Sequence, residues 1–130
     1  MAFSTNEIQV TWTSSNTTSV SASGTANSDD ISFSVSAIYA EIMVKADNSG
    51  TPADGDTLDV YLQKKADPDA DSSDDYESIG SFLVQLDTYD NDPAVRVISI
   101  PVGFNGRLHV ENNGASAMTV SAKVIEKLSS

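Results

Sequence analysis

The fold of this chain is decided by its last third, which reads PAVRVISIPVGFNGRLHVENNGASAMTVSAKVIE from Pro93 to Glu126. Apolar and polar residues alternate there in three short runs, at Val95–Ile100, Arg107–Glu111 and Met118–Val124. Because successive side chains of a strand point to opposite faces of a sheet, this period of two predicts three strands with one buried face each. The pair Asn113–Gly114 between the last two runs suits a tight hairpin turn. We therefore expect the chain to end in an antiparallel meander that a second layer covers.

Length and composition are those of a single all-β domain. The chain has 130 residues, enough for one hydrophobic core but not for two. No long segment repeats its apolar residues at the 3.6-residue period of a helix. The sequence contains no cysteine, so the fold uses neither disulfides nor thiolate metal ligands. We expect residues 1–130 to form one domain.

The charge of the chain argues against two classes of partner. Its 19 acidic and 7 basic residues give a formal net charge of −12 at pH 7. Such a field repels nucleic acid, whose binding depends on Lys and Arg contacts to phosphate, and it repels anionic lipid. No apolar run is long enough to span a bilayer, and the N-terminus lacks the basic and apolar regions of a signal peptide. We expect no nucleic-acid partner, no membrane partner and synthesis in a cytoplasm.

Further alternating runs precede the last third. They are Glu7–Thr13, Ile31–Val35, Ala37–Ala46, Thr57–Lys64 and Ser78–Asp87. The alternation changes phase between Val35 and Ala37, which suggests a bulge or a strand that bends from one sheet to the other. About eight strands separated by turn-rich loops predict a two-layer antiparallel β-sandwich. A jelly roll is favoured by the strand number and by the lack of a Cys…Trp…Cys frame, and an immunoglobulin-like sandwich is the alternative.

The inward positions of these runs should form the core. They are Ile42, Val44, Val60, Leu62, Phe82, Val84, Val97, Leu108, Val110, Val120 and Val124, and Ile79 is expected to point inward as well. The single tryptophan, Trp12, is expected to pack in the core or in an interface. The polar segment Ser14–Asp30 has too little apolar content for a core strand. It is an edge strand around Thr18–Ala22, an arm over a neighbouring copy, or a linker.

The acidic loop Asp67–Asp75 is the most suggestive stretch for metal chemistry. Its weak candidate ligands for calcium are Asp67, Asp69 and Asp71, which alternate like the first three ligand positions of an EF-hand loop. The rest of that motif fails, because Ser72 replaces the invariant glycine and Ser78 replaces the bidentate glutamate. A looser calcium site would also need Asp87, Asp90 or Asp92. We expect a solvated loop and no cofactor.

No residue pattern announces a reaction. His109 is the only histidine, on the polar face of its strand beside Arg107 and Glu111. A lone histidine lacks the partners for a metal cluster or a Ser-His-Asp arrangement. The sequence also lacks a glycine-rich phosphate loop and a nucleophile elbow. We therefore expect His109 to be a surface or interface residue, no catalytic residue, and a protein that is not an enzyme.

Several of these stretches together resemble the small β-sandwich proteins that decorate or stabilise the heads of tailed phages. They are Leu58–Gln63, the acidic loop, Tyr76–Phe82, Arg96–Ile98 and Thr119–Ala122, within a resemblance that covers about Ile38–Glu126. The resemblance implies a non-enzymatic virion protein, made in the host cytoplasm and located on the capsid surface. The implied partners are the major capsid protein or another virion protein, and further copies of the chain in a homo-oligomer, with a trimer favoured.

The residues leave other functions open. One is another phage component, such as a fibre, spike or adaptor module. Another is a jelly-roll carbohydrate-binding module that stacks sugars on Trp12, Tyr39, Tyr61 or Tyr89 and holds calcium in the acidic loops. For the virion protein we expect Ser14–Asp30 and Phe3 to contact a neighbouring copy or the capsid through main-chain hydrogen bonds at a sheet edge.

Overall fold

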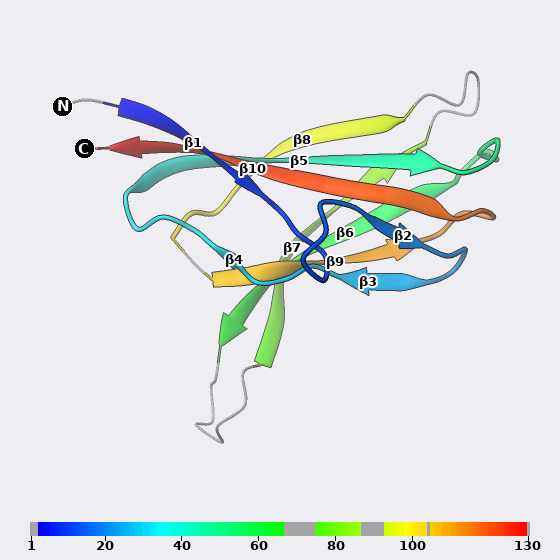
Figure 1. Cartoon of the computed structure of the whole chain (residues 1–130), viewed down its shortest axis with the longest axis horizontal. Coiled ribbons are helices and arrows are strands. Elements are labelled where there is room, and N and C mark those ends of the chain that lie inside the picture. Colours follow the sequence, from blue (N-terminus) through cyan, green and yellow to red (C-terminus); the bar gives the residue numbers. More distant parts are fainter. Residues whose placement is uncertain (1–2, 67–74, 87–92, 104, 130) are drawn as a thin grey trace.

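The computed structural model describes residues 3–66, 75–86, 93–103 and 105–129, and within these ranges it contains strands and no helix. The strands are β1 (Phe3–Gln9), β2 (Thr18–Val20), β3 (Thr25–Asn27), β4 (Ile31–Ser32), β5 (Ala37–Asn48), β6 (Thr57–Ala66), β7 (Asp75–Gln85), β8 (Ala94–Ile100), β9 (Asn105–Asn112) and β10 (Met118–Ser129). They form two antiparallel sheets packed face to face (Figure 1). The predicted all-β sandwich is confirmed.

The strand order is that of a jelly roll. The first sheet has the order β1-β10-β5-β8 with β2 also on β10, and the second has the order β3-β9-β6-β7 with β4 also on β9. The pairing is nested: β1 and β2 pair with β10, β3 and β4 with β9, β5 with β8, and β6 with β7. Nested pairing is what results when one long antiparallel hairpin folds over on itself. The jelly roll was therefore the right choice over the immunoglobulin-like alternative.

The predicted terminal meander is wrong. β8 and β10 belong to the first sheet and β9 to the second, so these consecutive strands do not pair with one another. The turn at Asn113–Gly114 carries the chain from one sheet to the other. Asn112, which is buried, holds this connection: its Oδ1 accepts a hydrogen bond from the Gly114 N–H at 2.7 Å, and its Nδ2 donates to the Ser116 carbonyl oxygen at 2.9 Å.

The phase change near Val35 marks another crossing between the sheets. Ile31 and Phe33 are buried at the edge of the second sheet, whereas β5 belongs to the first. Between them Val35 is 98% exposed, because the alternation stops where the chain turns. This is the predicted bend from one sheet to the other.

The core contains every predicted core residue except Val97 and Ile79. Val97 pairs with Met43 of β5, which places its side chain on the outer face of the first sheet, while Ile98 and Ile100 face inward. Ile79 is exposed because the β6–β7 register shifts there: Leu62 pairs with Gly80 and Gln63 with Ser78, so Ile79 is the extra residue of a bulge.

The polar segment Ser14–Asp30 forms β2 and β3 at the sheet edges. The expectation that it is too polar for the core is wrong in one respect, because Val20 is fully buried. The turn before β2 is held by Asp29, whose carboxylate accepts hydrogen bonds from the main-chain N–H groups of Thr13 at 3.1 Å and Ser14 at 2.9 Å. These hydrogen bonds, that from Ser14 foremost, lower the pKa of Asp29.

Candidate functional surfaces

Only some of the predicted site residues lie within the ranges that the structure describes. Asp67, Asp69 and Asp71 lie outside the described residues, as do Tyr89 and the three aspartates of the following loop, Asp87, Asp90 and Asp92. Among the residues that are described, no three His, Asp or Glu side chains are placed to hold a metal ion. The described part of the chain also has no helix long and apolar enough to cross a membrane.

Trp12 packs in the core, as predicted. Its side chain is 3% exposed, and its main chain forms an isolated bridge with Ser15. A ring that is buried offers no face to a ligand. Trp12 is therefore not the sugar-stacking surface that the carbohydrate-binding alternative requires. Of the aromatic residues named for that alternative, Tyr39 and Tyr61 are the other two that the structure describes.

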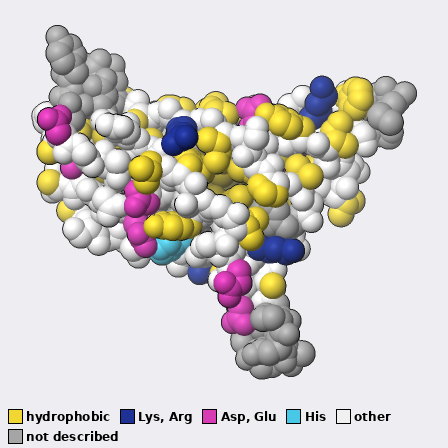
Figure 2. All heavy atoms as spheres, turned by 180° about the vertical axis from the view of Figure 1, so that it is seen from behind, with side chains coloured by type: hydrophobic (Ala, Val, Ile, Leu, Met, Phe, Trp, Pro, Cys, Tyr) yellow, Lys and Arg dark blue, Asp and Glu magenta, His cyan; other side chains and the backbone are white. Residues whose placement is uncertain are grey.

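His109 lies on the outer face of the second sheet, in one row with its cross-strand partners Asn27 of β3 and Tyr61 of β6. Its Nδ1 is 2.7 Å from Oδ1 of Asn27, and its Nε2 is 3.2 Å from Oε1 of Glu111. The ring centroids of His109 and Tyr61 are 5.7 Å apart. The histidine and the acidic side chains beside it are visible in Figure 2, which agrees with the predicted surface position. The nearby Glu111 carboxylate raises the pKa of Tyr61.

A second group of polar contacts adjoins this row. The Arg107 guanidinium lies over the Tyr76 ring, 3.7 Å from its centroid, and its Nε donates to Oε1 of Gln63 at 2.8 Å. The Tyr76 hydroxyl donates to Asp30 at 2.6 Å, and Lys65 Nζ donates to the same carboxylate at 3.0 Å. These hydrogen bonds lower the pKa of Asp30 and, in return, the Asp30 carboxylate raises the pKa of Tyr76.

We call the two groups together the polar aromatic face, defined by Asn27, Tyr61, Tyr76, Arg107 and His109. It offers ring faces together with amide, guanidinium and imidazole groups, which are the groups that recognise polar ligands with ring faces, such as sugars. Sequence reasoning missed Asn27 and Tyr76 as members. No local pattern could have found them, because they come from strands that only the folded sheet brings together.

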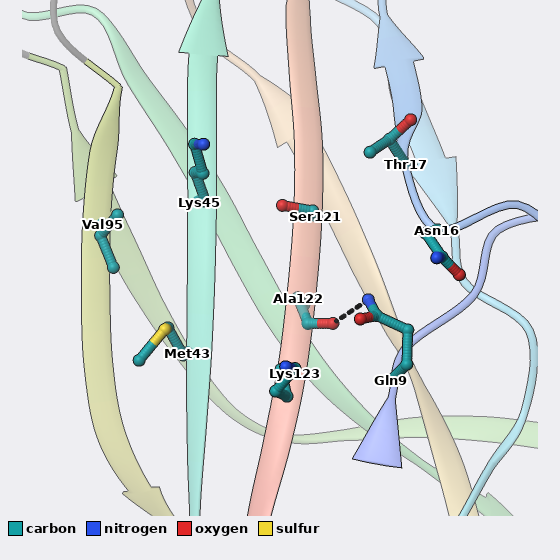
Figure 3. Close-up of a pocket in the computed structure, with 9 residues that line it drawn as sticks. All are labelled: Gln9, Asn16, Thr17, Met43, Lys45, Val95, Ser121, Ala122 and Lys123. Carbon is teal, nitrogen blue, oxygen red and sulfur yellow. Dashed lines mark hydrogen bonds between the residues drawn. The ribbon is translucent and has the colours of Figure 1, made fainter. Parts of the chain in front are cut away.

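The outer face of the first sheet carries a shallow groove of about 260 Å³ (Figure 3). Its lining residues are Gln9, Asn16, Thr17, Met43, Lys45, Val95, Ser121, Ala122 and Lys123. Met43 and Val95 form an apolar side next to β8. On the opposite side the Gln9 side chain donates a hydrogen bond to the carbonyl oxygen of Ala122 at 3.0 Å. The groove is open, and its described lining residues include no pair of acid and base groups of the kind catalysis requires.

One end of the sandwich is apolar. The starts of β1 and β5, the end of β10 and the loop after β8 lie there (Figure 1). Its exposed hydrophobic residues are Phe3, Val35, Ile38, Tyr39 and Val102. We call this surface the apolar end.

No protein-family model and no curated protein matches the chain. Among solved structures, a family GH115 4-O-methyl-alpha-glucuronidase aligns with 92% of this chain at a TM-score of 0.50 and 10% identity, but the chain spans only 16% of that enzyme. At this identity the likeness is one of fold alone.

Two further solved structures align at lower scores. The Yersinia pseudotuberculosis-derived mitogen aligns with 99% of this chain and 86% of its own, at 8% identity and a TM-score of 0.40. A family 16 carbohydrate-binding module aligns with 92% of this chain and 84% of its own, at 14% identity and a TM-score of 0.41.

Proposed function

We propose that this chain is a non-enzymatic structural protein of a phage virion that binds the capsid surface through its apolar end. The observation that carries the proposal is the exposure of this end. Val35 is 98% exposed, Phe3 54% and Ile38 51%. Large apolar side chains that are exposed together are a feature of protein interaction sites. The sequence resemblance to phage head-decoration proteins supports a capsid as the partner.

The apolar end is held in place before any partner arrives. Phe3 pairs with Ser129, and the Ser129 N–H donates to the Ser36 carbonyl oxygen at 3.0 Å, which ties β10 to the loop that carries Val35. The Tyr39 hydroxyl lies 2.8 Å from the Ser99 hydroxyl on the neighbouring strand. A surface that is already ordered loses less conformational entropy on binding, which suits a protein that must attach tightly to a shell.

The proposal is tested by adding purified chain to capsids that lack it. Cryo-electron microscopy should then show the sandwich on the capsid surface with its apolar end toward the shell. Combining Phe3→Ser with Val35→Asp should weaken attachment at least tenfold, because the contact becomes polar. Leu83→Asp is the matched control, since Leu83 is half exposed on β7, away from this end, and should attach normally.

Far-UV circular dichroism should be the same for both variants and the intact chain, because all three positions are exposed. Equal attachment of the double variant and the intact chain would contradict the proposal. So would density for the chain in the tail and not on the head, which would favour the fibre, spike or adaptor alternative.

A carbohydrate-binding module is a second candidate, and the polar aromatic face favours it. Sugar rings stack on aromatic side chains while their hydroxyls bond to amide, carboxylate and guanidinium groups. Titration of the labelled chain with a panel of oligosaccharides should shift the NMR resonances of Tyr61, Tyr76 and His109 if this candidate is right. Tyr61→Ala should then abolish binding, while Tyr39→Ala, on the other sheet, should leave it unchanged. Binding to no sugar in the panel would count against this candidate and not against the capsid role.

A further inference from the structure

β8 is an edge strand without the usual protection against pairing with another chain. Natural edge strands avoid such pairing by being short, bulged or charged. The edges formed by β2, β3 and β4 are only two or three residues long. The β7 edge carries the bulge at Ile79 and begins with the acidic residues Asp75 and Glu77. β1 presents Glu7, which pairs with Lys123 at 3.3 Å.

β8 is neither short nor bulged, and its one charged side chain is hydrogen-bonded to β7. All seven of its residues pair with β5 without a register shift, and no strand of the described residues pairs with its other edge. Val95 is 53% exposed and Val97 43%. The one charged residue, Arg96, donates from Nη1 to the Leu83 carbonyl oxygen at 2.8 Å and so reaches toward β7. Pro93 precedes the strand and therefore removes no donor from it.

The charges that the described residues place on the outer face of the first sheet do not oppose the approach of a second copy. The whole chain carries a net charge of −12, which opposes the approach of a second copy. The strand registers put six charged side chains of the described residues on the outer face of the first sheet, namely Lys45, Lys123 and Lys127 with Glu7, Glu41 and Asp47. Three of each sign balance, so the described residues of this face do not share the acidic excess of the whole chain.

We infer that β8 pairs in antiparallel fashion with β8 of a second copy, around a two-fold axis that passes through Val97. Val97 is the midpoint of the strand, so this register uses all seven residues of both copies. Each Arg96 then faces Ile98 of the second copy. An axis through Arg96 would instead set two guanidinium groups directly opposite each other, which is unfavourable.

The inferred dimer makes one continuous sheet from the two first sheets. Because Met43 lies beside Val97 in the β5–β8 register, an apolar row runs from Met43 through both copies of Val97 to the second Met43. Identical surfaces related by a two-fold axis are the commonest arrangement in homo-oligomers. The arrangement differs from the trimer that the sequence resemblance implies. Because the two β8 strands run in opposite directions, the two apolar ends lie at opposite ends of the dimer. It does not depend on the proposed capsid role.

Cysteine substitution tests the register directly, because the natural chain has no cysteine. Residues directly opposite in an antiparallel pair have Cα atoms about 4.5–5.5 Å apart, within disulfide range. Val97→Cys should therefore form a covalent dimer on mild oxidation. Val95→Cys should not, because its two copies would lie four residues apart, about 13 Å along the strands. Equal crosslinking of both variants, or crosslinking of Val95→Cys alone, overturns the inferred axis.

Sedimentation velocity tests the dimer without any crosslink. The intact chain should sediment as a dimer, and Val97→Lys should weaken association at least tenfold because it places two lysines at the axis. Leu83→Lys, the same change at a half-exposed position on the β7 edge, should still form the dimer. A monomeric or trimeric intact chain overturns the inference, whereas a dimer that fails to attach to capsids would contradict only the proposed function.

Discussion

The side chain of Asn112 donates a hydrogen bond from Nδ2 to the main-chain oxygen of Val20 at 2.9 Å, and this contact joins the end of β9 in the second sheet to β2 in the first. Both residues are fully buried. Asn112 also bonds to Gly114 and Ser116, so one side chain satisfies three main-chain groups where the chain changes sheets.

Replacing this asparagine should therefore be costly. Asn112→Ala removes the partner of three main-chain groups, two of them in buried contacts, and we expect a loss of about 2–4 kcal/mol in the free energy of unfolding. Urea denaturation followed by circular dichroism measures it. Asn113→Ala is the control: Asn113 bonds to Asp59 at the surface, and its loss should cost less than about 1 kcal/mol. Equal losses for the two variants would contradict the central role of Asn112.

The glycine of the same turn is expected to be needed for close packing. A Cβ at position 114 would lie 2.9 Å from Met118 Cε and 3.1 Å from Asn112 Oδ1, so Gly114→Ala should destabilise the fold by about 1–3 kcal/mol. A Cβ at Gly80 would meet nothing within 4 Å, so Gly80→Ala should be close to neutral. Thermal unfolding of the two variants compares them directly. A neutral Gly114→Ala would mean that Met118 moves away at little cost.

The core and the outer surface of the sandwich should respond differently to the same truncation. Leu108 is fully buried and Leu83 is half exposed. Leu108→Ala should cost about 2–5 kcal/mol, because it removes buried apolar surface and leaves a cavity. Leu83→Ala should cost less than about 1 kcal/mol. Urea midpoints for both variants test the assignment of faces, and a reversed order would show that the sheet faces are assigned wrongly.

The Asp30–Tyr76 hydrogen bond should make stability depend on pH at both extremes. The pKa of Asp30 is lowered from 3.8 in the folded protein, so its contribution is present above that value and is lost as pH falls through the folded pKa. The pKa of Tyr76 is raised from 10.0, so its contribution is present below that value and is lost as pH rises through the folded pKa.

Two variants separate these contributions. Tyr76→Phe removes the donor, so the loss of stability below about pH 4 should become shallower, and Asp30→Asn should make the contribution of this site disappear. Urea midpoints measured across both pH windows provide the test. If stability falls at low pH to the same extent in Asp30→Asn as in the intact chain, other carboxylates account for that loss.

The sequence alone located the strands from β4 to β10 and, for most of them, which face is buried. It missed β3, and it placed the first strand at Glu7–Thr13, whereas β1 spans Phe3–Gln9. In β6 the alternation of Leu58, Val60 and Leu62 with polar residues leaves one apolar face, and all three side chains are buried. This information is local, because the geometry of an extended backbone sets the direction of each side chain from its neighbours alone.

Only the tertiary structure decided which sheet each strand joins and which face β8 buries. β8 has apolar residues in both phases, with Val95 and Val97 in one and Ile98 and Ile100 in the other, so its pairing with β5, and not its own pattern, turned Val97 outward. The bulge at Ile79 and the gathering of Tyr76, Arg107 and His109 on one face likewise depend on register between distant strands. Register is a long-range property: it is set by the core that both sheets bury together, and a local alternation of residues carries no record of the strand that will lie beside it.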